Sequence, residues 1–122
     1  MNNINLRKKG NKFERIAKEY FRKLNYKIID LNWYCHWGEI DLILEDNYDL
    51  VFAEVKYRSR DIFDINEVFT YKKKISLKRS IFNYLKENED QDKNWRLDLF
   101  YITISSGDKS KLNFRHFKNI LL

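Results

Sequence analysis

Apolar residues recur with helical spacing near the start of the chain and again in its middle. Over residues 9–24 they lie three and four positions apart, which predicts an amphipathic helix. Asn25 is a suitable residue for ending it. A second stripe with the same spacing, from Val68 to Leu85, predicts a helix over residues 66–87.

Other stretches have the residue types and the alternation of β-strands. They are residues 26–31, 39–44, 50–57 and 95–104. Acidic residues and Asn over 45–49 predict an antiparallel hairpin between the second and third of these strands. We expect an aromatic loop over 32–38, a polar loop over 88–94 and a turn over 105–110, while residues 112–122 fit a strand, a helix or both.

The order of these elements, α-β-β-β-α-β, predicts an α/β fold with a central sheet and helices packed against it. The 122 residues predict a single domain, 1–122, that buries a core without disulfides or a structural metal. No apolar run approaches the length of about 18 residues that a membrane span needs, and residues 1–10 do not resemble a signal peptide. The single cysteine, Cys35, excludes an internal disulfide and suits the cytoplasm.

The net charge of +6 is unevenly distributed along the chain. Residues 1–27 hold nine Lys and Arg against two acidic residues, and residues 56–79 hold eight against three. Between them, residues 28–55 hold seven acidic residues and no Lys or Arg. Carboxylates that bind a cation, flanked by basic groups that bind phosphate, would produce this pattern. An A/T-rich genome would also raise the lysine content without any ligand.

The acidic segment places Asp41 and Glu54 on neighbouring predicted strands, with Lys56 on the same face as Glu54. If Glu45 pairs with Leu50 across the hairpin, Asp41 lies opposite Glu54 and the two carboxylates can share a cation. A loop one residue shorter would place them on opposite faces. The alternative is a solvated strand face with charges paired across strands.

Two adjacent carboxylates with only oxygen donors suit Mg²⁺ or Mn²⁺. Lys56 would then position an attacking water or stabilise charge on a phosphate. Glu39 lies on the same strand face as Asp41. Glu14 lies at the border of the first helix's apolar stripe and can reach a cleft between helix and sheet, although an acid at a helix edge is also common without a ligand.

The motif Asp41-x12-Glu54-x-Lys56 resembles the signature of the PD-(D/E)xK nucleases. The flanking words, GEIDLI at residues 38–43 and FAEVK at residues 52–56, resemble the YraN family of bacterial proteins. The likeness extends over nearly the whole chain and includes further matched positions: Gly10, Glu14, Glu67, Lys73, Arg96-Leu97-Asp98 and His116. The sequence departs from the family at Phe69, where Val is usual, and at Asp64, where Phe63 is often followed by Gly.

This resemblance implies a restriction-endonuclease-like core with a mixed sheet, similar to Holliday junction resolvases and tRNA-endonuclease-like domains. It implies that Asp41 and Glu54 ligate Mg²⁺ or Mn²⁺ and that Lys56 orients the attacking water. Glu14 would hold a second ion or a water of the first. Contact with the nucleic-acid backbone would come from basic residues of two stretches: Arg58, Arg60, Lys72 and Lys73.

The function expected is that of a Mg²⁺-dependent nuclease acting on structured or damaged DNA in repair, recombination or uptake. An accessory module that binds nucleic acid without cutting it is the second hypothesis, and a protein-interaction module is the third. The sequence does not separate DNA from RNA as the partner, and a homodimer is plausible; we expect no membrane partner. We assign Cys35, His36 and His116 to packing, because no further metal-type ligands accompany them at suitable spacing.

The aromatic residues of the 32–38 stretch, Trp33, Tyr34 and Trp37, can either stack on splayed bases or cap the core. The run Lys72-Lys73-Lys74 can equally be a solvated helix face.

Overall fold

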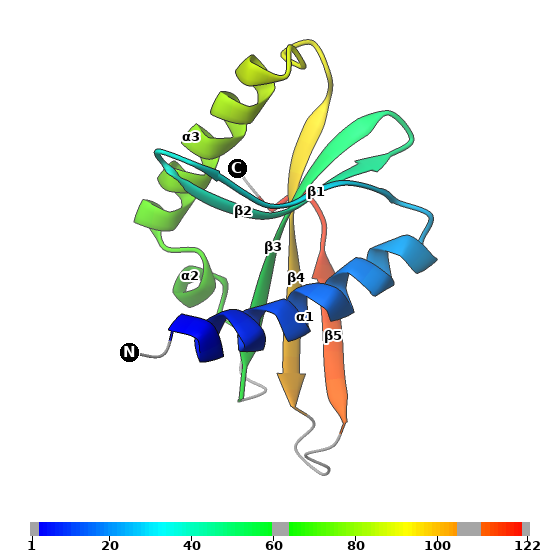
Figure 1. Ribbon diagram of the computed structural model, residues 1–122, viewed down its shortest axis with the longest axis vertical. Helices are drawn as coiled ribbons and strands as arrows, with labels where there is room; N and C mark the ends of the chain where they lie inside the picture. Colours follow the sequence, from blue (N-terminus) through cyan, green and yellow to red (C-terminus); the bar gives the residue numbers. More distant parts are fainter. Residues whose placement is uncertain (1–2, 60–63, 105–110, 121–122) are drawn as a thin grey trace.

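A mixed β-sheet with helices on both faces forms the protein (Figure 1). The structure is a computed structural model that describes residues 3–59, 64–104 and 111–120, with side chains from residue 12 onward. Within these ranges the elements are α1 (Asn3–Lys23), β1 (Lys27–Cys35), β2 (Gly38–Asp46), β3 (Asp49–Arg58), α2 (Ile65–Val68), α3 (Tyr71–Glu87), β4 (Trp95–Ile104) and β5 (Leu112–Phe117). The predicted α/β fold is confirmed and is compatible with a restriction-endonuclease-like core.

The described strands form one sheet in the order β1-β2-β3-β4-β5. β3 and β4 run parallel, and the other neighbours run antiparallel. Parallel neighbours need a long crossover, which α2 and α3 supply between β3 and β4. The crossover therefore places the start of α3 near the end of β3, where Glu54 and Lys56 lie.

The central strands are buried on both faces, so the sheet separates two apolar cores. Along β3, Phe52 packs toward α3 while Val51 and Ala53 pack toward α1. Figure 1 shows α1 crossing one face of the sheet and α3 on the other. α1 buries the apolar stripe from which it was predicted. α3 does so only in part: Tyr71 and Phe82 of its predicted stripe are exposed, and the helix instead buries Leu77, Ile81, Tyr84 and Leu85. No helix in the described part of the chain is long and apolar enough to cross a membrane.

The prediction of one continuous helix over residues 66–87 is wrong, because α2 ends at Val68 and α3 begins at Tyr71. The side-chain oxygen of Thr70 accepts the backbone N–H of Lys73 at 3.2 Å, which is the geometry of a helix N-cap. Val68 and Phe69 beside the break are both buried. The break places Lys73 in the first turn of α3.

The prediction of a loop over residues 32–38 is also wrong. β1 continues to Cys35, which lies opposite Gly38 across a two-residue turn, so β1 and β2 extend as a hairpin arm. Gly38 has φ +143°, and a Cβ there would lie 3.1 Å from Ser76 Oγ on α3. Since Ser76 also donates a hydrogen bond to the carbonyl of Trp37, the arm is held closely against α3.

The limits of α1, β4 and β5 test the remaining predictions of helices and strands. α1 begins at Asn3 instead of residue 9, but it stops as predicted, with Asn25 in the left-handed conformation at φ 66°. β4 has the predicted limits. β5 pairs antiparallel with β4, so the strand alternative for the C-terminal stretch is the one adopted in the described residues.

Candidate functional site

The hairpin between β2 and β3 has the register that brings the two carboxylates together. Glu45 pairs with Leu50, as predicted, and regular pairing continues to Leu42 and Ala53. Beyond that pair, the backbone N–H of Val55 on β3 donates a hydrogen bond of 2.9 Å to the side-chain Oδ2 atom of Asp41 on β2. The Asp41 side chain is thereby fixed beside Glu54, where the strands begin to diverge.

A cleft of about 530 Å³ opens at this point between the hairpin arm, α1, the end of β3 and the start of α3. Its lining residues are Phe13, Glu14, Glu39, Asp41, Glu54, Val55, Lys56, Tyr57, Arg58 and Lys73. The rings of Phe13 and Tyr57 are stacked, with centroids 4.2 Å apart. This stack fixes α1 against β3 at the residue before Glu14, so Glu14 lies over the cleft.

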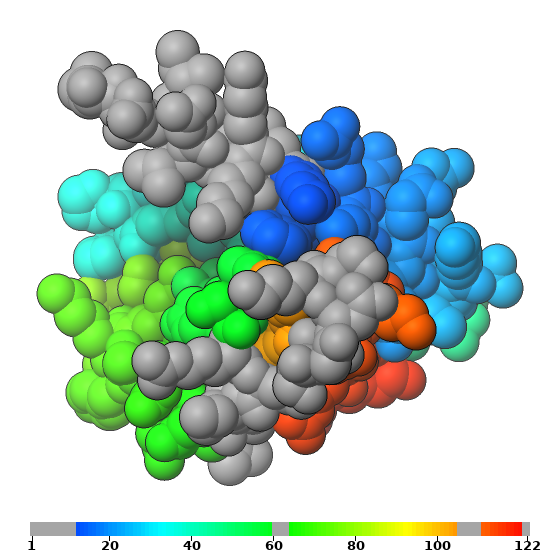
Figure 2. All heavy atoms as spheres, turned by 90° about the horizontal axis from the view of Figure 1, so that it is seen from below, coloured from blue at the N-terminus to red at the C-terminus, as the bar shows by residue number. Residues whose placement is uncertain are grey.

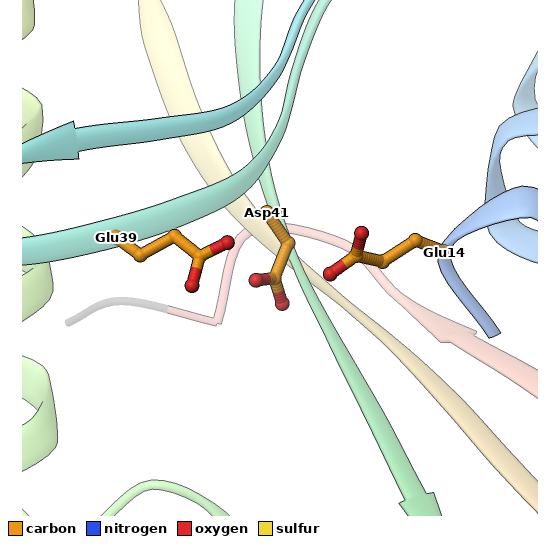
Figure 3. A group of neighbouring side chains, drawn as sticks. All are labelled: Glu14, Glu39 and Asp41. Carbon is orange, nitrogen blue, oxygen red and sulfur yellow. The ribbon is translucent and has the colours of Figure 1, made fainter. Parts of the chain in front are cut away.

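Three carboxylates converge inside the cleft. Glu39 and Asp41 come from one face of β2 and Glu14 comes from α1, and the side chains point toward one another (Figure 3). One oxygen from each can be chosen so that all lie within 4.8 Å of one another. Burial raises the pKa of each of these carboxyl groups, and the charge of Asp41 raises those of Glu14 and Glu39 further.

Glu54 is the most deeply buried acid of the cleft, with 4% of its surface exposed. Its Oε1 atom lies 3.7 Å from the ammonium groups of both Lys56 and Lys73. Its Oε2 atom is buried and accepts no hydrogen bond from the described residues, although a proton on Glu54 can be shared with Asp41. Burial, together with the charge of Asp41, raises the pKa of Glu54 to about 8.

The residues predicted from the sequence fall into two groups. The structure brings Glu14, Asp41, Glu54 and Lys56 together in the cleft, and the basic side chains of Arg58 and Lys73 line it too. Lys72 is exposed on α3 and does not line the cleft. Arg60 lies outside the described residues.

Sequence reasoning did not select Glu39, although its spacing of two residues from Asp41 placed it on the same strand face. What the pattern did not show is how α1 and the hairpin arm pack around the cleft, with the arm against α3 and Glu14 of α1 over the carboxylates, so that Glu39 and Glu14 both approach Asp41.

The cleft fits a hard divalent cation on three grounds. Its donors are all carboxylate oxygens, which Mg²⁺ and Mn²⁺ prefer. The charge of Asp41 raises the pKa values of Glu14, Glu39 and Glu54, and a cation would relieve that repulsion. Glu54 Oε2 is buried and accepts no hydrogen bond from the described residues, so it is available as a cation ligand.

A second polar cluster, centred on Asp98, lies outside the cleft. The buried Asp98 carboxylate accepts hydrogen bonds from Arg96 Nε at 3.0 Å, from the Asn119 backbone N–H at 3.0 Å and from His116 Nε2 at 2.8 Å. Burial alone would raise the pKa of Asp98, but these hydrogen bonds and the Arg96 charge hold it below its usual value. The cluster joins β4, β5 and the C-terminal stretch, which agrees with the structural interpretation of His116.

The α/β sheet with flanking helices, which holds a carboxylate-and-lysine cleft where two strands diverge, is compatible with a restriction-endonuclease-like fold. A model of an uncharacterised protein family, UPF0102, matches residues 13–102. The chain belongs to this family, which is the YraN family, so the resemblance seen in the sequence is confirmed.

Several curated relatives match over most of their length. A UPF0102 protein of Carboxydothermus hydrogenoformans is 38% identical over 119 residues, covering 97% of this chain and 98% of the relative. One of Pseudoalteromonas translucida is 33% identical, covering 90% and 89%, and one of Herpetosiphon aurantiacus is 36% identical, covering 84% and 86%. These names state no activity, so the function has to be argued from the site.

Proposed function

We propose that this protein is a nuclease that uses Mg²⁺ or Mn²⁺ to hydrolyse phosphodiester bonds in structured or damaged DNA, in repair, recombination or uptake. The observation that carries the proposal is Glu54. A buried carboxylate with an unpartnered oxygen, next to Asp41 and between two ammonium groups, suits cation binding beside a phosphate. A purely structural acid at this depth would be expected to have its oxygens hydrogen-bonded.

Asp41 and Glu54 are the proposed primary ligands, with Glu14 and Glu39 able to hold a second ion or its waters. When bound, the cation would polarise a phosphate oxygen and lower the pKa of a coordinated water. The hydrogen bond from Val55 orients Asp41, and the stack of Phe13 on Tyr57 keeps Glu14 above it.

The remaining side chains of the cleft supply positive charge and a proton acceptor. Lys56 and Lys73 approach the Glu54 carboxylate from β3 and from α3, so a phosphate bound beside it would lie between two ammonium groups. Arg58 lines the cleft farther along β3. Water would attack phosphorus and release a 3′-hydroxyl and a 5′-phosphate, while Glu14 or Glu39, whose pKa values are raised, would accept the proton.

One observation favours an accessory module that binds nucleic acid without cutting it. Lys56 and Lys73 already place two ammonium groups beside the carboxyl groups of the cleft, so positive charge is present there without a cation. In that case the basic residues around the cleft would bind the backbone and no bond would break.

Cleavage assays separate these two functions. Labelled single-stranded, duplex, flap and four-way-junction DNAs, with matching RNAs, would be incubated with the protein in Mg²⁺, Mn²⁺ or EDTA. The nuclease proposal requires cleavage that depends on metal, is lost in Asp41→Asn and Lys56→Gln, and persists in Glu45→Gln, which removes a β2 carboxylate outside the cleft. Salt-sensitive binding of DNA without cleavage would support the accessory module.

A further inference from the structure

A second hollow adjoins the cleft on the other side of Glu14. It measures about 270 Å³, half the volume of the cleft, and lies between α1 and β1. Its lining residues are Glu14, Arg15, Lys18, Leu31 and Asn32. Because Glu14 lines both spaces, whatever occupies one lies next to whatever occupies the other.

We propose that this hollow is a phosphate subsite for a polynucleotide chain, which binds the backbone next to the bond held in the cleft. This inference rests on the proposed function in one respect, namely that the cleft receives a nucleic-acid backbone. It adds a binding site on the α1–β1 side, away from the basic residues of β3 and α3.

The charges of the hollow suit a phosphate. Arg15 and Lys18 are three residues apart on α1, so both can present their cationic groups on one side of the helix. Glu14 is the one acid among the lining residues, and it stands at the boundary with the cleft. A phosphate in the hollow would therefore lie against Arg15 and Lys18, with the carboxylate cluster on its far side.

Asn32 connects the two spaces. It lies in β1 with φ 52°, a left-handed conformation that asparagine tolerates better than most residues. Its side chain hydrogen-bonds to Glu14, which lowers the pKa of that carboxyl group against the larger effect of burial. This contact holds Glu14 at the boundary between the two spaces.

Leu31 gives the hollow an apolar element beside its charges. Its side chain is 38% exposed and lies next to Asn32 on an edge strand of the sheet. A sugar or base attached to the bound phosphate could cover this surface, whereas inorganic phosphate would leave it in water. A polynucleotide therefore uses more of the hollow than a free anion does.

The end of the molecule seen in Figure 2 shows how the chain brings these parts together. Atoms of α1, in blue, lie near those of the α2–α3 region, in green, and the hairpin arm, in cyan, lies to one side. A strand that passes from the start of α3 through the cleft to the α1–β1 hollow would meet Lys73, then the carboxylates, then Arg15 and Lys18.

Binding measurements with length-graded DNA test the subsite. Fluorescence anisotropy would follow labelled single-stranded oligonucleotides, from dinucleotides upward, in Ca²⁺ in place of Mg²⁺ and at several salt concentrations. The variants are Arg15→Gln and Lys18→Gln. Lys23→Gln is the matched control, because Lys23 is an exposed lysine in the last turn of α1 and lines neither space.

We expect Lys18→Gln and Arg15→Gln each to weaken binding of the longer oligonucleotides by about tenfold at low salt. The salt dependence of the affinity should also fall by about one phosphate contact. Dinucleotides, which do not reach beyond the cleft, should bind all variants alike, and Lys23→Gln should stay within about twofold of wild type at every length. Affinities and salt slopes that are the same in all three variants would overturn the subsite.

Inorganic phosphate that competes as effectively as an oligonucleotide would also overturn it, since the hollow would then be a site for free anions. The subsite and the nuclease proposal fail separately. Loss of affinity in Lys18→Gln without any cleavage by wild type keeps the subsite and refutes the nuclease. Metal-dependent cleavage by the wild type, with unchanged DNA binding in Lys18→Gln and Arg15→Gln, supports the nuclease and refutes the subsite.

Discussion

Replacing Glu54 with glutamine should stabilise the metal-free protein at neutral pH while removing its response to metal. The change keeps the size of the side chain and removes its charge. In the wild type the Glu54 carboxyl group has a pKa of about 8, against 4.5 for an ordinary glutamate, because it is buried beside Asp41. The folded protein therefore holds a proton there that the unfolded chain releases.

The size of the effect follows from the difference between the pKa of Glu54 in the unfolded chain, 4.5, and in the folded protein, about 8. A carboxyl group whose pKa is raised on folding contributes its full stability below pH 4.5 and loses it as the pH rises toward 8. Each pH unit in the interval costs about 1.4 kcal/mol, so at about pH 7 the wild type has lost on the order of 3 kcal/mol. Glutamine does not titrate, so Glu54→Gln should escape this loss.

Urea unfolding in EDTA across this pH range measures the difference directly. The free energy of unfolding of Glu54→Gln minus that of wild type should grow by about 3 kcal/mol between pH 4.5 and about pH 7. Glu45→Gln, which removes a carboxylate outside the cleft, should differ from wild type by at most about 0.5 kcal/mol. A difference for Glu54→Gln that does not grow with pH would show that the two lysines keep Glu54 ionised, and would refute the reasoning. Adding Mg²⁺ should stabilise the wild type but not Glu54→Gln.

Three further substitutions test how the fold holds the site. Asp98→Asn leaves the half-buried Arg96 charge with Asp46 as its remaining acidic partner among the described residues, and should lower the free energy of unfolding by about 3 kcal/mol in urea titrations; an effect below about 1 kcal/mol would contradict this. Thr70→Ala removes the N-cap of α3 and should lower the free energy of unfolding by about 1 kcal/mol. The helical signal in circular dichroism should fall by no more than the contribution of one helical turn. Gly38→Ala strains a left-handed position against Ser76 and should lower the melting temperature, whereas an unchanged melting temperature would show that the hairpin arm can move aside.

The parts of the site that could be predicted from the sequence are those set by local alternation. The acidic turn left two registers open for β2 and β3, and the structure adopts the one that pairs Glu45 with Leu50 and places Asp41 beside Glu54. The apolar stripe of α1 likewise showed which of its acids, Glu14, borders the core.

What the sequence did not show depends on contacts between distant segments. Glu39 joins the cluster through the packing of the hairpin arm against α3 and of α1 against β3, and periodicity does not record how these elements pack. The apolar spacing predicted one helix through Thr70, but Thr70 caps a new helix there and the apolar side chains Tyr71 and Phe82 of that spacing are exposed. That cap sets the phase of α3, which places Lys73 in the cleft and leaves Lys72 in solvent.

Calorimetric titration of the metal-free protein with Mn²⁺ tests the central claim, that the cleft is a divalent-cation site, most directly. Repeating the titration in buffers with different ionisation enthalpies counts the protons released on binding. Because Glu54 is protonated below about pH 8, binding near neutral pH should release about one proton per ion. Binding should be lost in Asp41→Asn and retained in Glu45→Gln. Wild-type protein that binds no Mn²⁺, or that binds it equally well after Asp41→Asn, would contradict the account.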